Sequence, residues 1–162
     1  WLRAQGVDVV PIRATERRAY LEENCGALDV KLARDEIDKL SARPDFSMLI
    51  YPVVSMGEFT HGGSKNNLLG KNPTPEMIEK CSSEKAVTPQ TPPVFLLTTS
   101  DDWVDCRNSL DFASACKANK VPVTLHLFET GGHGYGLHGK NELAVWPELL
   151  EGWLETKGYK KP

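Results

Sequence analysis

Two apolar strands separated by one helical segment constrain the fold of this chain more than any other feature. Residues 94–98 (VFLLT) and 123–128 (VTLHLF) are the two apolar runs, and a segment with helical periodicity joins them. A strand, a helix and a second strand in succession favour a parallel sheet with a right-handed crossover. We therefore expect an α/β fold in which the two strands belong to one sheet.

A third strand and two further helices are predicted outside this unit. Residues 46–51 form a short apolar run closed by a proline, typical of a buried strand in a parallel sheet. Thr74 and Pro75 can begin a helix, with the threonine as N-cap and the proline in the first turn. A last helix ends near Gly158, and Pro147 marks either a kink in it or its start. Its apolar residues recur at steps of three and four: Leu143, Trp146, Leu149, Leu150, Trp153 and Leu154.

The segment between the two strands is predicted to be helical from about Asp105 to Asn119. The aspartate can cap its first turn. The side chains expected to face inward are Leu110, Phe112, Ala113 and Cys116. Residues 54–72, by contrast, are rich in glycine, serine and asparagine, and we expect them to form a long surface loop.

Size, charge and cysteine content exclude several classes of protein. A chain of 162 residues can bury a sizeable core, and its net charge of −3 gives no reason to expect nucleic acid as a partner. No apolar run approaches the roughly 18 residues that a membrane-spanning helix needs. The four cysteines form no CxxC pair, so we expect inert thiols and no metal site. A disulfide between Cys81 and Cys106 is left open.

The amino-terminal residues 1–34 match none of these patterns well. A strand at residues 6–10 and a helix over residues 28–40 are the elements that can be predicted there. The first residue is not methionine and no signal-peptide pattern follows it. We therefore expect the chain to begin within a longer protein, and we leave residues 1–34 unassigned.

Polar groups follow both apolar strands at the points where they end. Asp101 and Asp102 come after the first strand, and His133, between glycines, comes after the second. Ligands of open α/β sheets bind at the carboxyl ends of the strands, and an Asp–His pair there can orient an imidazole that moves protons. Asp101 lies nearer the strand and is predicted as this acid, with Asp102 as a turn or capping residue. His133 is predicted as the general base.

The sequence gives weaker evidence of a catalytic role for the remaining histidines and for any serine. We expect His61, His126 and His138 to be structural or exposed. A serine nucleophile of this architecture belongs in G-x-S-x-G, and no such motif occurs in the 162 residues. The nearest similar stretch is His61-Gly62-Gly63-Ser64, which is predicted to be part of the loop, so Ser64 is not expected to be catalytic.

Several motifs in order give the chain a family resemblance from about Asp35 to its end. They are Arg43-Pro44-Asp45-Phe46 to Tyr51-Pro52-Val53-Val54-Ser55-Met56, His61-Gly62-Gly63-Ser64 with Asn67-Leu68-Leu69-Gly70, Thr88-Pro89 with Thr91-Pro92-Pro93, Asp101-Asp102 with Asn108-Ser109, and Gly131-Gly132-His133-Gly134-Tyr135-Gly136-Leu137. This region resembles the C-terminal half of an α/β-hydrolase. The closest resemblance is to the esterase/lipase group of acetylxylan- and feruloyl-type esterases, which is related to the prolyl oligopeptidase family. The implied fold of residues 35–162 is the C-terminal part of an α/β-hydrolase parallel sheet with flanking helices.

The resemblance implies a serine-type carboxylic ester hydrolase that acts through an acyl-enzyme. Asp101 and His133 would be its acid and base, its substrate a small-molecule or polysaccharide ester such as an acylated saccharide, and it would need no cofactor. Two departures stand out. Val104-Asp105-Cys106 replaces the usual Val-Val-Pro, and residues 1–34 stand where the nucleophile elbow is expected. The chain by itself is therefore expected to have negligible activity.

Two alternatives to the esterase remain open at this point. One is a serine peptidase of the prolyl oligopeptidase kind. The other is a non-catalytic binding module that keeps the hydrolase fold without its chemistry. A nucleophile elbow and a propeller domain upstream would favour the peptidase, and the lack of any elbow upstream would favour the binding module.

Overall fold

The fold is seen in a computed structural model that describes residues 44–159 of the chain. The strand expected at residues 6–10 and the helix expected over residues 28–40 lie outside the described residues, as does the start of the hydrolase-like region at residues 35–43. Among the described helices, none has the length and apolar character needed to cross a membrane.

The centre of the described region is a parallel sheet of three strands. The strands are β1 (Ser47–Ile50), β2 (Val94–Thr99) and β3 (Val123–Phe128), arranged in the order β1-β2-β3. All pairings are parallel, with Val94 opposite both Ser47 and Val123. The α/β class expected from the sequence is confirmed, and the carboxyl ends of all three strands meet at one edge of the sheet.

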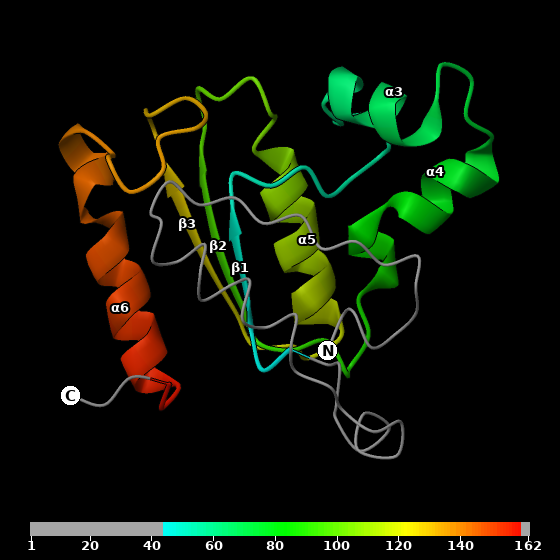
Figure 1. Cartoon of the computed structure of the whole chain (residues 1–162). Coiled ribbons are helices and arrows are strands. Elements are labelled where there is room, and N and C mark those ends of the chain that lie inside the picture. The colour runs from blue at the N-terminus through cyan, green and yellow to red at the C-terminus, as the bar shows by residue number, and fades with distance from the viewer. Residues whose placement is uncertain (1–43, 160–162) are drawn as a thin grey trace, which may run out of the picture. The chain divides into compact units, whose positions relative to one another are not determined.

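The central strand β2 is buried along its whole length because helices cover both faces of the sheet. Helix α5 (Arg107–Ala118) lies on one face and α6 (Trp146–Thr156) on the other (Figure 1). Successive side chains of a strand point to opposite faces. Alternate residues of β2 therefore belong to two separate cores, which explains the continuous apolar run in the sequence.

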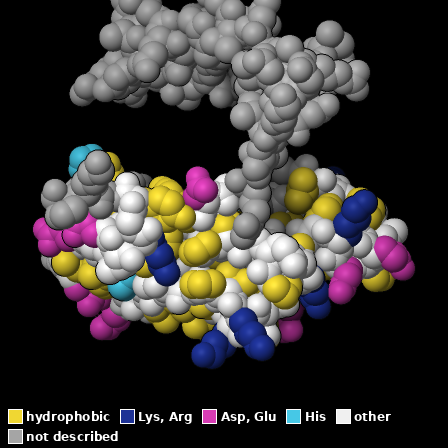
Figure 2. Space-filling model, turned by 90° about the horizontal axis from the view of Figure 1, so that it is seen from below, with side chains coloured by type: hydrophobic (Ala, Val, Ile, Leu, Met, Phe, Trp, Pro, Cys, Tyr) yellow, Lys and Arg dark blue, Asp and Glu magenta, His cyan; other side chains and the backbone are white. Residues whose placement is uncertain are grey.

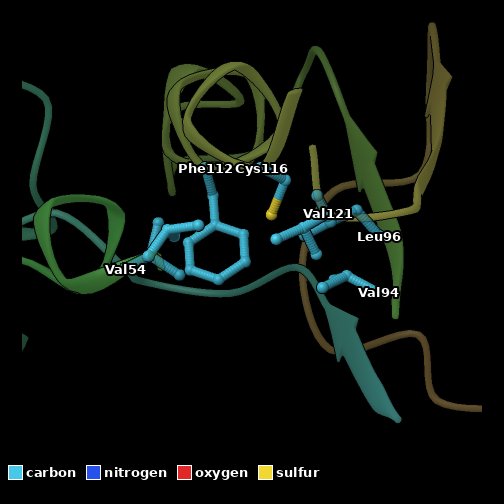
Figure 3. Packing of buried hydrophobic residues seen from close by; sticks show 7 residues of the cluster. Val54, Val94, Leu96, Phe112, Cys116 and Val121 are labelled. Carbon is cyan, nitrogen blue, oxygen red and sulfur yellow. The ribbon is translucent and has the colours of Figure 1, made fainter. Parts of the chain in front are cut away.

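The first core lies between β2 and α5. Val94 and Leu96 of the strand pack with Phe112 and Cys116 of the helix, and Val54 closes the cluster from the segment after β1 (Figure 3). The second core lies under α6. Its buried members are Phe95, Leu97, Leu143, Trp146 and Trp153.

Helix α5 ends where the sequence predicts, but its N-cap and part of its inner face differ from the prediction. The N-cap is Cys106 and not the predicted Asp105, although the Oδ1 atom of Asp105 accepts a hydrogen bond of 2.9 Å from the backbone N–H of Arg107. Asn119 is the C-cap, where the helix was predicted to stop. Leu110 was expected inside, but it is 38% exposed. It lies two residues from Phe112, about 200° around the helix, and therefore on the opposite side. Asn108, in its place, is buried.

The expected surface loop over residues 54–72 is wrong, because it contains helix α3 (Gly62–Leu69) and a buried segment. His61 caps the helix, and its ring nitrogen accepts a hydrogen bond of 3.3 Å from the backbone N–H of Ser64. None of the residues of α3 is buried, so the helix has no apolar stripe that a sequence pattern could reveal. At the start of the segment, Val54, Ser55 and Met56 are buried.

The other helices begin where capping chemistry predicts. Thr74 caps α4 (Pro75–Cys81), and its hydroxyl accepts a hydrogen bond of 3.3 Å from the backbone N–H of Met77. Pro147 lies in the first turn of α6, so it begins that helix rather than kinking it. Two short 3₁₀ turns, Ser83–Ala86 and Asn141–Val145, precede β2 and α6.

The described cysteines are unpaired with one another, and charges of both signs are mixed on the surface shown in Figure 2. Cys81, Cys106 and Cys116 are free thiols, so the disulfide left open between Cys81 and Cys106 is not formed. Figure 2 looks from below Figure 1, toward the end of the sheet where the strands begin, and shows hydrophobic side chains interspersed with charges of both signs. The described residues visible on that face form no continuous basic surface.

Candidate active site

The loops that follow β2 and β3 bring one carboxylate and one imidazole together. The Nδ1 atom of His133 lies 2.9 Å from Oδ2 of Asp102, although the two residues are 31 positions apart. Because β2 and β3 are parallel neighbours, their carboxyl ends lie side by side, and the loops that leave them can meet.

Burial around this pair suits an imidazole that is oriented by a carboxylate. The side chain of Asp102 is 0% exposed, whereas that of His133 is 28% exposed. The second oxygen of Asp102 accepts a hydrogen bond of 2.9 Å from the backbone N–H of Val104. With its Nδ1–H donated to the carboxylate, the neutral ring keeps Nε2 as a proton acceptor. An imidazole held in this way can act as a general base.

The expected contact between Asp101 and His133 is wrong, because Asp102 makes that contact. The β2–β3 hydrogen bonding continues as far as Ser100, whose backbone N–H donates to the carbonyl of Phe128 at 2.9 Å. A turn at Ser100 and Asp101 then changes the direction of the chain, so that the second acid reaches the ring. The expectation that Asp102 only caps or turns is corrected for the same reason.

Asp101 binds the backbone of the loop that carries His133. Its two carboxylate oxygens accept hydrogen bonds from the N–H groups of Gly131, at 3.1 Å, and Gly132, at 2.8 Å. Hydrogen bonds that stabilise the charged form lower the pKa of a carboxyl group. The backbone N–H of Gly132, followed by that of Gly131, accordingly holds the pKa of Asp101 below its ordinary value.

Two aromatic side chains that the sequence did not mark as site residues lie against the imidazole, and a third packs on one of them. The ring of Tyr51, just after β1, lies 4.5 Å from that of His133, and Trp103 stacks on the imidazole at 5.7 Å. Tyr135 meets Tyr51 edge-on at 4.8 Å. Tyr51 also has a backbone φ of +42°, which is rare for a residue other than glycine. The available signal was their position: Tyr51 directly follows β1, Trp103 directly follows Asp102, and Tyr135 lies two residues after His133.

Trp103 is exposed to solvent, whereas the hydroxyl of Tyr135 is buried. Trp103 is 78% exposed, so one face of its indole is open beside the His133 ring. The hydroxyl of Tyr135 is buried and has no hydrogen-bond partner among the described residues. Burial raises the pKa of Tyr135 well above its ordinary value, so the phenol stays neutral. It is therefore a poor candidate for a base.

The other described histidines make no recorded hydrogen bond to Asp102 or His133. His61 bonds the hydroxyl of Ser64 at 3.0 Å within the cap of α3, a local contact between residues three positions apart. His126 lies within β3, with its ring 5.2 Å from that of Phe95, and burial lowers its pKa. His138 is exposed in the loop after Gly136.

The described residues supply an acid and a base but not the third member of a triad. Within residues 44–159, no serine or cysteine side chain is hydrogen-bonded to the His133 ring. The same part of the chain holds no cluster of three or more histidine, cysteine, aspartate or glutamate side chains suited to a metal ion. The arrangement can orient an imidazole and move a proton through its Nε2 atom.

Comparison of the sequence with known proteins finds relatives among enzymes of xylan breakdown, although no family model matches. Endo-1,4-beta-xylanase B of Butyrivibrio fibrisolvens is 38% identical over 128 residues, which are 75% of this chain and 20% of that protein. An acetylxylan esterase of Xylanibacter ruminicola is 35% identical over 100 residues, 58% of this chain and 21% of that protein.

Comparison of the fold finds solved structures of ester hydrolases. The acetyl ester-xyloside bifunctional hydrolase of Caldicellulosiruptor lactoaceticus is 44% identical with a TM-score of 0.75, and the match covers 80% of this chain and 48% of that one. The carboxylesterase Cest-2923 of Lactobacillus plantarum is 27% identical with a TM-score of 0.61, over 80% of this chain and 50% of that one.

The matches cover only part of each related protein. The chain spans about a fifth of the length of the curated relatives and about half of the solved structures. The parallel sheet with helices on both faces agrees with the fold of these structures. Residues 44–159 therefore form part of an α/β-hydrolase fold, and the resemblance of the chain to the esterase/lipase group that includes acetylxylan esterases is confirmed.

Proposed function

We propose that Asp102 and His133 are the acid and base of a serine-type carboxylic ester hydrolase. The observation that carries this proposal is the 2.9 Å hydrogen bond between the buried carboxylate and Nδ1 of the imidazole. The role of the carboxylate is to hold the ring in the tautomer whose Nε2 accepts a proton, and to stabilise the imidazolium that forms.

The proton transfers follow from this geometry. Nε2 of His133 takes the proton of a serine hydroxyl as its oxygen attacks the ester carbonyl. The imidazolium then gives that proton to the departing alcohol, and an acyl-enzyme remains. In the second half of the reaction, Nε2 takes a proton from water as the water attacks the acyl group, and returns it to the serine oxygen.

The serine in this proposal comes from a segment outside the 162 residues, which contain no G-x-S-x-G motif. Members of a catalytic triad act as a unit, and the loss of one removes most of the rate enhancement. The chain alone is therefore expected to have negligible esterase activity.

The proposed substrates are esters of saccharides. The names of the relatives associate this type of chain with acetyl esters and xylosides. Trp103 supports the same class, because its exposed indole stands beside the candidate base. A flat aromatic face of this kind can pack against the C–H groups of a sugar ring.

The two alternatives receive less support. Neither of the two relatives nor either of the two solved structures described above is named as a peptidase. A binding module does not need a fully buried carboxylate aimed at an imidazole, whereas proton transfer does.

A hybrid enzyme tests the proposal. Residues 44–159 replace the matching segment of the Caldicellulosiruptor lactoaceticus hydrolase, which supplies the remainder of its own fold. We expect the hybrid to hydrolyse 4-nitrophenyl acetate, and His133→Ala to lower kcat by about 10³-fold or more. The 162-residue chain alone should show no turnover above that of its own His133→Ala variant.

Two outcomes would contradict the proposal. Turnover by the chain alone that disappears in His133→Ala would show that the chain has its own nucleophile. A folded hybrid that binds acetylated xylo-oligosaccharides without hydrolysing them would favour the binding module.

A further inference from the structure

The loop that carries His133 is anchored to β2 by a second acid. We propose that Asp101 is a positioning residue that holds the Gly131–Gly132 backbone, and through it the imidazole, in place. This inference rests on the proposed function for its catalytic consequence, but its structural part can be tested without any activity.

The carboxylate of Asp101 binds the main chain of the histidine loop at two points. Its Oδ2 accepts from Gly131 N–H at 3.1 Å and its Oδ1 from Gly132 N–H at 2.8 Å, so one carboxylate fixes two consecutive peptide groups. Charge-assisted hydrogen bonds of this kind are stronger than those between neutral groups. Two contacts on one rigid carboxylate also fix the orientation of the backbone, which a single contact does not.

A second side chain, from the last residue of β2, binds the carbonyl group of Gly132. The hydroxyl of Thr99 donates to the carbonyl oxygen of Gly132 at 3.0 Å. Gly131 has no room for a side chain, because a Cβ atom there would lie 2.9 Å from the methyl group of Thr99 and would overlap Leu143. Asp101 and Thr99 therefore hold Gly132 on both sides of its Cα atom, Asp101 through the N–H and Thr99 through the C=O.

The segment that enters the loop is fixed as well. The side chain of Ser100 donates to the carbonyl oxygen of Glu129 at 2.9 Å. The backbone N–H of Glu129 donates to Oε1 of Glu142 at 2.9 Å. Only three residues separate Glu129 from His133, so the position of the imidazole depends on how Glu129 is held.

The consequence for the site follows from adjacency. Gly132 directly precedes His133, so any movement of the Gly132 backbone moves the ring relative to Asp102. A displacement of about 1 Å in a catalytic group can cost about 10²-fold in rate. The carboxylate of Asp101 is hydrogen-bonded to the loop backbone, whereas the imidazole is bonded to Asp102, so the effect of Asp101 on the ring would come through the backbone.

The structural part is tested by NMR on the full 162-residue chain. In the wild type, the amide resonances of Gly131 and Gly132 should follow the titration of the Asp101 carboxyl group, with a midpoint below the ordinary aspartate value. In Asp101→Asn and Asp101→Ala, both amides should shift, and the downfield Nδ1–H resonance of His133 should move or broaden. Asp111→Asn, which removes an exposed carboxylate from α5, is the matched control and should change neither.

The catalytic part is tested in the hybrid. Asp101→Asn should lower kcat by about 10- to 100-fold with little change in KM, and Asp101→Glu should recover less than half of the loss. Amide resonances of Gly131 and Gly132 that ignore the Asp101 titration, or a His133 signal unchanged in Asp101→Ala, would overturn the inference. If the loop amides respond as expected but the hybrid never hydrolyses esters, the positioning role of Asp101 is supported and the proposed function fails.

Discussion

Asp101 and Asp102 are neighbours in the chain, yet their carboxylates bind different parts of one loop. Asp101 accepts hydrogen bonds from the backbone of Gly131 and Gly132, and Asp102 accepts one from the ring of His133. The turn at Ser100 and Asp101 makes this division possible, because it points successive side chains at the main chain and at the imidazole. The two adjacent acids therefore differ in what they bind: Asp101 binds the loop backbone and Asp102 binds the imidazole.

Replacing Gly131 by alanine should displace the histidine loop. The added Cβ would overlap Leu143, and we expect Gly131→Ala to lower the free energy of unfolding by about 1–3 kcal/mol more than its control does. Urea denaturation followed by tryptophan fluorescence measures the difference. The control is Gly134→Ala, where φ is +76° but nothing lies within 4 Å of a Cβ atom. Equal destabilisation by both variants would show that steric overlap at Gly131 is unimportant.

Asn108 should be among the most sensitive polar residues of the described region. Its Oδ1 accepts from the backbone N–H groups of Val54 and Ser55, and its Nδ2 donates to the carbonyl oxygens of Phe59 and Asp105. Asn108→Ala would leave buried backbone groups without partners, and should cost about 2–4 kcal/mol of stability in urea denaturation.

The matched control for Asn108 is Asn119→Ala. The side chain of Asn119 makes a single hydrogen bond, of 3.0 Å, to the carbonyl oxygen of Ala115 at the end of α5. Its removal should cost about 1 kcal/mol or less. A loss at Asn108 no larger than that at Asn119 would contradict the view that this buried amide ties α5 to the segment after β1.

His126 should make stability depend on pH. Burial against β2 lowers its pKa below the ordinary value of 6.5, so the unfolded chain binds the proton more readily than the folded one. Stability contributed by the neutral ring is therefore present above about pH 6.5 and declines as the pH falls toward the folded pKa. Urea midpoints of the wild type should fall between pH 7.5 and pH 5.5, and His126→Leu and His126→Gln should both reduce this fall. An unchanged fall in both variants would exclude His126 as its source.

Trp103 should affect sugar esters more than simple esters. In the hybrid, Trp103→Ala should raise KM for acetylated xylo-oligosaccharides by about 2- to 10-fold, the size expected for the loss of about 0.5–1.5 kcal/mol of ring packing. KM for 4-nitrophenyl acetate should stay within about twofold of its original value, because this ester has no sugar ring. Trp103→Tyr keeps an aromatic face and is the control. Equal effects on both substrates would argue against a saccharide contact.

The strands could be predicted because their physical signal is local. A strand buried on both faces must be apolar at every position, and β2 is. The helix start at Thr74 could also be predicted, since capping depends on a few adjacent residues. Pro147 left a start and a kink of the last helix open, and the structure shows the start. Helix α3 was missed because it buries nothing and so carries no periodic pattern.

The candidate site could be predicted only as far as the loops that form it. The sequence places an acid after β2 and His133 after β3, but the choice between Asp101 and Asp102 depends on a turn whose direction no single residue reveals. Tyr51 could not be predicted as a neighbour of His133, because the contact depends on the arrangement of the sheet. Its contact with His133 joins β1 to the loop after β3, two strands away in the sheet.

The central claim is that Asp102, and not Asp101, is the acid that orients His133. The most direct test is kcat/KM of the hybrid on 4-nitrophenyl acetate, measured side by side for Asp102→Asn and Asp101→Asn. The predicted result is a loss of about 10³- to 10⁴-fold for Asp102→Asn, against at most about 10²-fold for Asp101→Asn. A larger loss for Asp101→Asn than for Asp102→Asn would contradict the account.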